Sequence, residues 1–156
     1  MQTIGISIDY SNICKDYNTA YLDRDNTDPA TNRCMKQVIE WTRKFLADLM
    51  EHFNYNIYPL NSITAVKIEE VAAKRFLFYS LEKEITLQSF VLDKEHQAFE
   101  NIASWEANNQ TGLLIQNDKD GEGLYLYLKE NSDLHYWINE RLKNFSVDDV
   151  PFIPNR

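Results

Sequence analysis

The chain begins with a regular alternation of apolar and small or polar residues. Ile4, Ile6 and Ile8 alternate with smaller residues over positions 3–8, which is the period of a strand with one buried face. The pattern breaks at residue 10, and residues 10–28 are mostly polar. We therefore expect a strand followed by a long loop, with 18–22 as an alternative short strand.

The next pattern is helical and covers residues 27–53. Asp28 is a good N-cap, and Pro29 suits the first helical position, where no N–H is needed. Apolar residues then recur at helical spacing, which predicts a long helix packed centrally against the sheet. They are Met35, Val38, Ile39, Phe45, Leu46, Leu49, Met50 and Phe53.

The remaining chain alternates between strand-like and helix-like segments. Pro59 indicates that the first of these strands is an edge strand or ends there. Asp93 and Ser132 are expected to cap the helices that follow them. The expected strands are 55–60, 85–92, 112–116 and 124–129, the last two forming a hairpin; the expected helices are 66–84 (76–79 alternatively strand), 94–107 and 133–145, followed by an irregular tail.

This order predicts an α/β or α+β fold in a single domain, residues 1–156. Alternation of strands and helices favours parallel pairing, whereas the hairpin adds an antiparallel piece. We expect a mixed sheet of about five strands with about four packed helices.

Charge narrows the possible partners. The chain has 16 basic and 24 acidic residues, a net charge of −8, and no basic run. Direct binding of nucleic acid or an anionic membrane is not expected, because both require clustered Lys and Arg. A basic protein partner explains the charge, and so does solubility alone.

Cysteine usage and the N-terminus predict a cytoplasmic protein. The N-terminus lacks the basic and apolar regions of a signal peptide, and no apolar run is long enough for a membrane helix. Cys14 and Cys34 form no C-x-x-C pair, so reduced thiols are favoured over a disulfide between them.

Three expected strands are each followed by an aspartate: Asp9, Asp93 and Asp118. If these carboxylates met at one sheet edge, they could hold Mg²⁺ for phosphodiester cleavage. Residues 4–12, IGISIDYSN, loosely resemble the first strand of ribonuclease H-like and PIN-like nucleases, in which an Asp closes the strand. We favour the simpler interpretation that Asp9 is the first residue of a loop, and we predict no metal and no cofactor.

The loop at 10–28 is the candidate partner-binding surface. It interleaves tyrosines, which provide contact area at low entropy cost, with aspartates, which can pair with Arg or Lys. The alternative is a solvated loop whose tyrosines fold back on the core. The candidate residues are Tyr10, Asp16, Tyr17, Tyr21, Asp23, Asp25 and Asp28.

No catalytic constellation is recognisable. The three histidines fall on expected helices, and there is neither a G-x-S-x-G motif nor a Gly-rich phosphate loop. We therefore predict no catalytic residue and favour a non-enzymatic binding protein of inhibitor or immunity type, which would mask a basic protein partner such as a nuclease toxin.

Two alternatives stay open. One is a metal-dependent nuclease or phosphohydrolase that uses the three strand-end aspartates. The other is an oligomeric structural module, in which residues 124–128 would bury their leucines and expose Tyr125 and Tyr127 for pairing across an interface.

Overall fold

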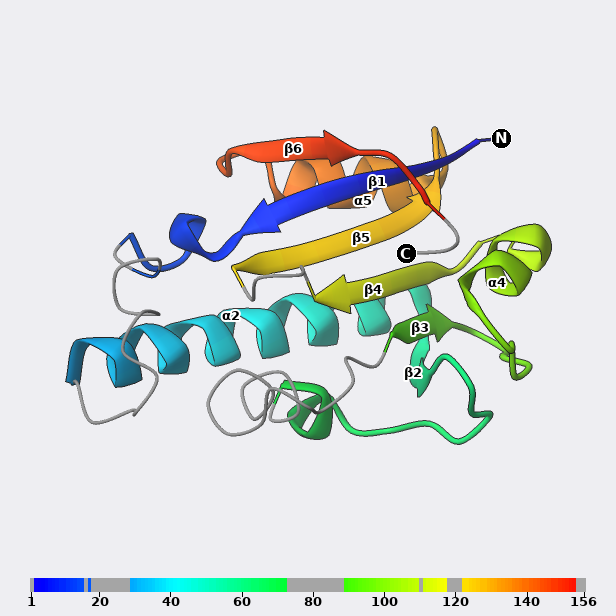
Figure 1. Cartoon of the computed structure of the whole chain (residues 1–156), viewed down its shortest axis with the longest axis horizontal. Coiled ribbons are helices and arrows are strands. Elements are labelled where there is room, and N and C mark those ends of the chain that lie inside the picture. The colour runs from blue at the N-terminus through cyan, green and yellow to red at the C-terminus, as the bar shows by residue number, and fades with distance from the viewer. Residues whose placement is uncertain are drawn as a thin grey trace.

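The N-terminal alternation of isoleucines forms a strand, β1 (Thr3–Asp9), inside a six-stranded sheet (Figure 1). The computed structural model describes residues 2–15, 17, 29–72, 89–109, 111–117 and 122–153. The other elements are η1 (Tyr10–Asn12), α2 (Pro29–Phe53), β2 (Asn56–Pro59), β3 (Phe90–Asp93), α4 (Ile102–Asn108), β4 (Leu113–Asn117), β5 (Gly123–Lys129), α5 (Asp133–Arg141) and β6 (Val147–Val150).

The sheet has the strand order β2-β3-β4-β5-β1-β6, and every neighbouring pair is antiparallel. The single α+β domain is confirmed, but the sheet is antiparallel throughout rather than mixed, and it has six strands where about five were expected. α2 carries the chain across the sheet from β1 to the far edge, rather than connecting adjacent parallel strands. The sixth strand, β6, comes from the tail that was expected to be irregular, and it pairs with β1.

One face of the sheet carries the main core. The isoleucines of β1 and the leucines of β5 pack there with α2 and α5, and Phe45, Leu46 and Leu49 of α2 are fully buried. This confirms the central position predicted for the long helix. The two helices are joined by Arg141, which donates a hydrogen bond to Asp48 and thereby lowers the pKa of that carboxyl.

The opposite face carries a smaller cluster, which includes Val91, Trp105 and Tyr127. α4 and the chain after β6 cover this face, so both sides of the sheet are occupied. Tyr127 is consequently buried and Tyr125 half-buried, although the one-sided pattern predicted that both would be exposed. The leucines at 124, 126 and 128 are buried as expected.

The helix expected at 94–107 begins only at Ile102. The side-chain oxygen of Asn101 accepts a hydrogen bond from the N–H of Ser104, and the hydroxyl of Ser104 accepts one from the N–H of Asn101, which completes a capping box. Asp93 is therefore not the cap. Ser132 caps α5 as predicted, but α5 ends at Arg141 and is followed by turns.

Some sequence predictions fall partly or wholly outside the described residues. Of the helix expected at 66–84, residues 66–72 are described; 68–72 are helical, whereas 66 and 67 are not. The alternative strand at 18–22 and the first part of the strand expected at 85–92 lie outside the described part of the chain.

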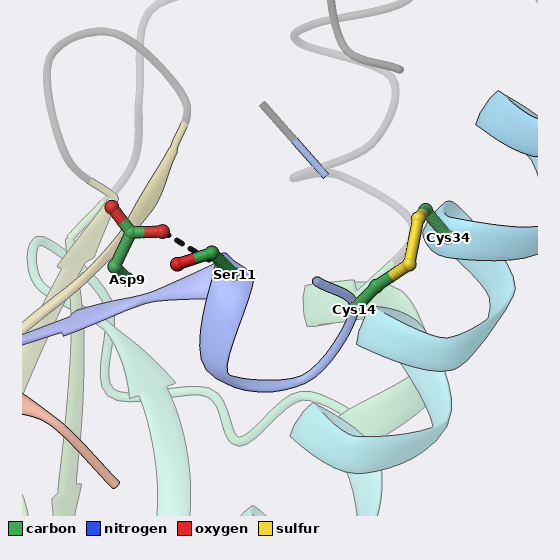
Figure 2. The surroundings of a disulfide bond; sticks show 4 residues. All are labelled: Asp9, Ser11, Cys14 and Cys34. Carbon is green, nitrogen blue, oxygen red and sulfur yellow. Dashed lines mark hydrogen bonds between the residues drawn. A yellow bond between two sulfur atoms is a disulfide. The ribbon is translucent and has the colours of Figure 1, made fainter. Parts of the chain in front are cut away.

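Cys14 and Cys34 form a disulfide, with their Cα atoms 5.5 Å apart (Figure 2). The expectation of reduced thiols is therefore wrong. Cys14 follows η1 and Cys34 lies on α2, and packing of α2 beneath the end of β1 brings the two thiols together. The disulfide fixes the exit of β1 to the central helix.

Among the described helices, none combines the length and apolar character needed to cross a membrane.

Candidate functional site

A groove of about 790 Å³ opens at the end of the sheet where β6 stops pairing with β1. We call it the β6 groove. Its walls are residues 2–5 around the start of β1, residues 149–152, Glu106 of α4, Glu130 ahead of α5, and His135 and Asn139 on α5.

The groove exists because β6 is shorter than β1. Their last pair is Gly5 with Val150, and Pro151 has no N–H with which to extend the ladder. The chain then leaves the sheet edge, and Phe152 packs its ring against Tyr127 at 5.3 Å on the opposite face. Residues 2–4, around the start of β1, are thus left beside an open space.

Gly5 allows the two strands to approach closely at the rim of this groove. A Cβ atom at this position would lie 2.6 Å from Cγ2 of Val150 and 2.7 Å from the ring of Tyr127. Any larger residue would have to displace β6 or the tyrosine.

The charge of the groove is negative. Glu106 accepts a hydrogen bond from Oγ1 of Thr3 at 3.0 Å and pairs with Nζ of Lys129 at 3.4 Å. Glu130 and Asp149 have no salt bridge with any residue in the described part of the chain. None of the described lining residues is Lys or Arg. Two carboxylates are therefore available to a cation from outside.

Hydrogen bonds hold the polar side chains of the groove in place. Thr3 accepts a hydrogen bond from the ammonium of Lys129 at 3.0 Å and donates one to Glu106, so this hydroxyl links the two side chains. Nδ1 of His135 accepts a hydrogen bond from the N–H of Asn131, so this ring stabilises the turn before α5.

The strand-end aspartates do not converge. The registers of β3, β4, β5 and β1 place Asp93 level with Thr3, six residues from Asp9 along the strand direction. With strand spacings of about 4.8 Å and a rise of about 3.3 Å per residue, Asp9 and Asp93 are about 25 Å apart. A metal ion needs ligands within a few ångströms, so these two carboxylates cannot share one. Asp118 lies outside the described residues.

Asp9 instead has a structural role. Its carboxylate accepts a hydrogen bond from the N–H of Ser11 at 2.8 Å and caps η1, as Figure 2 shows. Its carbonyl accepts from the side chain of Asn12, which also bonds Ser146 ahead of β6. Asp9 is thus the last residue of β1 rather than the first residue of a loop, and its carboxylate caps the turn that follows.

Asp93 is half-buried and belongs to a polar cluster at the end of β3. It accepts hydrogen bonds from the N–H of Lys94 at 2.8 Å and from Oγ1 of Thr111 at 3.4 Å. The carbonyl of Thr111 accepts from the hydroxyl of Tyr55 at 2.6 Å. Burial raises the pKa of Asp93 and raises the pKa of Tyr55 to about 12.

His96 packs beside this cluster. Its ring stacks on Tyr58 with centroids 4.6 Å apart and meets Phe99 edge-on at 5.4 Å, and burial lowers its pKa. Shifted pKa values can mark active sites. Here the carboxylate and hydroxyl fasten the loop after β3 to the start of β4, so we interpret the cluster as structural.

The loop predicted to bind a partner is described only at its start. Tyr10 and Tyr17 are 2% exposed and meet edge-to-face at 5.2 Å, so these two tyrosines belong to the core, as the alternative interpretation had it. Their assignment to an exposed binding surface is wrong, because the disulfide and η1 hold this part of the chain against α2. Asp16, Tyr21, Asp23, Asp25 and Asp28 lie outside the described residues, and their role stays a prediction.

Comparisons with protein-family models, with curated proteins and with solved structures find no match.

The groove was not predicted from the sequence. Its walls come from both ends of the chain and from α4, and no local spacing signals that they meet. Two features of the tail could have suggested it: Pro151 directly after an acidic strand, and Phe152 as an isolated aromatic near the C-terminus.

Proposed function

We propose that this protein is a non-enzymatic binding protein of inhibitor or immunity type, which masks a basic protein partner such as a nuclease toxin. The observation that supports this most is the β6 groove, whose described walls carry two carboxylates without a salt bridge and no Lys or Arg. An Arg or Lys side chain of the partner that enters this groove would pair with Glu130 or Asp149.

The net charge of the chain also favours a basic partner. A chain with a net charge of −8 attracts a basic surface over roughly a Debye length, about 8 Å at physiological ionic strength. Such attraction speeds the encounter and disfavours acidic partners. The groove carboxylates would then fix the orientation after contact.

The alternatives receive less support. A hydrolase would need the strand-end aspartates to share one metal ion, but Asp9 and Asp93 lie at opposite ends of the sheet. An interface formed by exposed tyrosines of β5 could not include Tyr127, because that side chain is buried.

The cellular location also stays a proposal. The sequence favours the cytoplasm, whereas the Cys14–Cys34 disulfide is of the kind that persists in oxidising compartments. Of the two, the disulfide is the more direct observation, and it favours an oxidising compartment for the folded protein.

The test uses three immobilised baits exposed to an extract of the source cells: the wild type, a Glu130→Gln/Asp149→Asn groove variant, and a Glu40→Gln/Glu51→Gln control. The control removes the same charge from exposed positions on α2. We expect the wild type and the control to retain a basic protein that the groove variant releases, and we expect stoichiometric addition of the wild type to inhibit that protein.

Capture of the same protein by all three baits would overturn the assignment of the groove. A captured partner whose activity is unchanged by the wild type would overturn the inhibitory function.

A further inference from the structure

β6 lies at the edge of the sheet, and its outer side has no neighbouring strand in the described part of the chain (Figure 1). Three of its four residues are exposed. An uncovered edge strand offers main-chain donors and acceptors to another strand. The direction of each main-chain group decides whether such pairing is possible here.

The alternation of hydrogen bonds along β1 gives these directions. The N–H of Tyr10 donates to Glu122 and the N–H of Glu130 donates to Gln2, each at 2.8 Å. The N–H and C=O groups of even-numbered residues of β1 therefore point toward β5. Those of the odd-numbered residues Gly5 and Ser7 point toward β6.

The register between β6 and β1 then shows which main-chain groups of β6 bond to β1 and which point away from the sheet. Val150 and Asp148 stand opposite Gly5 and Ser7, so their main-chain groups bond to β1. Ser146 agrees with this, since its N–H and its carbonyl both bond the side chain of Asn12 on the β1 side. The N–H and C=O groups of Val147 and Asp149 consequently point outward, away from the sheet.

The charges on β6 decide which strand could add there. Asp149 lies on the face of Ile6, and Asp148 lies on the face of Ser7, so both faces of the edge carry an exposed carboxylate. A second copy of β6 would bring aspartates close to aspartates, which is unfavourable. A strand with Lys or Arg on its faces would be attracted by both.

We propose that a basic, extended segment of the partner adds to the sheet as a seventh strand alongside β6. It bonds the outward main-chain groups of Val147 and Asp149, and its basic side chains meet the carboxylates of Asp148 and Asp149. Because the β6 groove begins at the end of this strand, a basic side chain at the end of the added segment enters it. This inference rests on the proposed function and specifies how the partner is held.

The probe is a short blocked peptide of alternating lysine and valine, compared with the same peptide N-methylated at every amide. Both peptides carry the same charge, but only the first can donate main-chain hydrogen bonds. We expect at least about tenfold weaker binding of the methylated peptide, because about two hydrogen bonds are lost. Isothermal titration measures both affinities.

A matched pair of variants tests the same contact on the protein. Val147→Pro removes an outward N–H that β1 does not use, whereas Val147→Ala keeps the N–H and shortens the side chain. We expect the proline variant to bind the peptide about fivefold more weakly, because one hydrogen bond is lost, and the alanine variant to bind it nearly as the wild type does. Thermal melts report whether each variant folds.

Hydrogen exchange of the wild type provides a readout that needs no variant. On addition of the peptide, the amides of Val147 and Asp149 should become protected, whereas the amide of Asp148, already bonded to β1, should change little. Protection in this alternating pattern supports strand addition.

Equal binding of both peptides with no protection at Val147 and Asp149 would overturn strand addition, and so would a lack of peptide binding. If the bait experiment still returns a groove-dependent basic partner in either case, the proposed function survives without this docking mode. If no basic protein is captured and the peptide does not bind, both proposals fail.

Discussion

Reduction of the Cys14–Cys34 disulfide should lower the stability of the fold by about 3 kcal/mol. The two cysteines are 20 residues apart in the sequence, and closing a loop of this length in the unfolded chain costs about 11 cal/mol/K of entropy. At room temperature this is about 3 kcal/mol. Because both cysteines are buried, the reduced thiols keep their apolar contacts and little packing is lost.

The assay is thermal and urea unfolding of the same protein with and without dithiothreitol. For a chain of this size we expect the melting temperature to fall by about 10 °C. A Cys14→Ala/Cys34→Ala variant serves as control; it should melt near the reduced wild type and should not respond to dithiothreitol.

Two results would refute this reasoning. One is a melting temperature of the wild type that dithiothreitol leaves unchanged. The other is the titration of two free thiols in the untreated, unfolded protein, which would mean that the disulfide does not form.

Three further predictions concern the fold. Asp9→Ala should cost about 1 kcal/mol in urea unfolding because it removes the cap of η1, whereas Asp9→Asn should cost far less; equal losses would contradict the capping role. Leu46→Ala should cost about 2–5 kcal/mol, since Leu46 is fully buried on α2, and a loss below about half a kcal/mol would contradict the packing. His96 has a lowered pKa, so the unfolded state binds its proton more tightly; stability should fall as the pH drops below about 6.5, and His96→Gln should remove that part of the decline in urea titrations at several pH values.

The elements with strong local patterns were predictable. Apolar residues with a period of two predict β1, and apolar residues at helical spacing predict α2. Pro29 begins α2 as expected. The Ser132 cap of α5 has the same local origin. Such signals need only neighbouring residues, which is why one sequence suffices to find them.

What depends on distant residues was not predictable. β6 has the exposed pattern of a loop and becomes a strand only because β1 offers it an unpaired edge. Tyr127 is buried because α4 and Phe152 cover a face of the sheet that the alternation assigns to solvent. The disulfide likewise depends on the packing of α2 under β1 and not on a spacing motif.

The candidate site shows the same limit. The acidic character of the chain was visible in its composition and suggested a basic partner. The groove itself joins Thr3, Glu106 and Asp149, which are far apart in the sequence. The loop that the sequence favoured turned out to bury Tyr10 and Tyr17, because a tyrosine in a polar loop suits a core as well as an interface.

The most direct test of the account is the association rate of the captured partner with the wild type and with the Glu130→Gln/Asp149→Asn variant, measured by surface plasmon resonance over a series of salt concentrations. If the groove receives a basic partner, the wild-type rate should fall steeply as salt rises. The variant should associate more slowly, with a weaker salt dependence, and dissociate faster than the Glu40→Gln/Glu51→Gln control. Equal rates for all three proteins at every salt concentration would contradict the central claim that the β6 groove binds a basic protein.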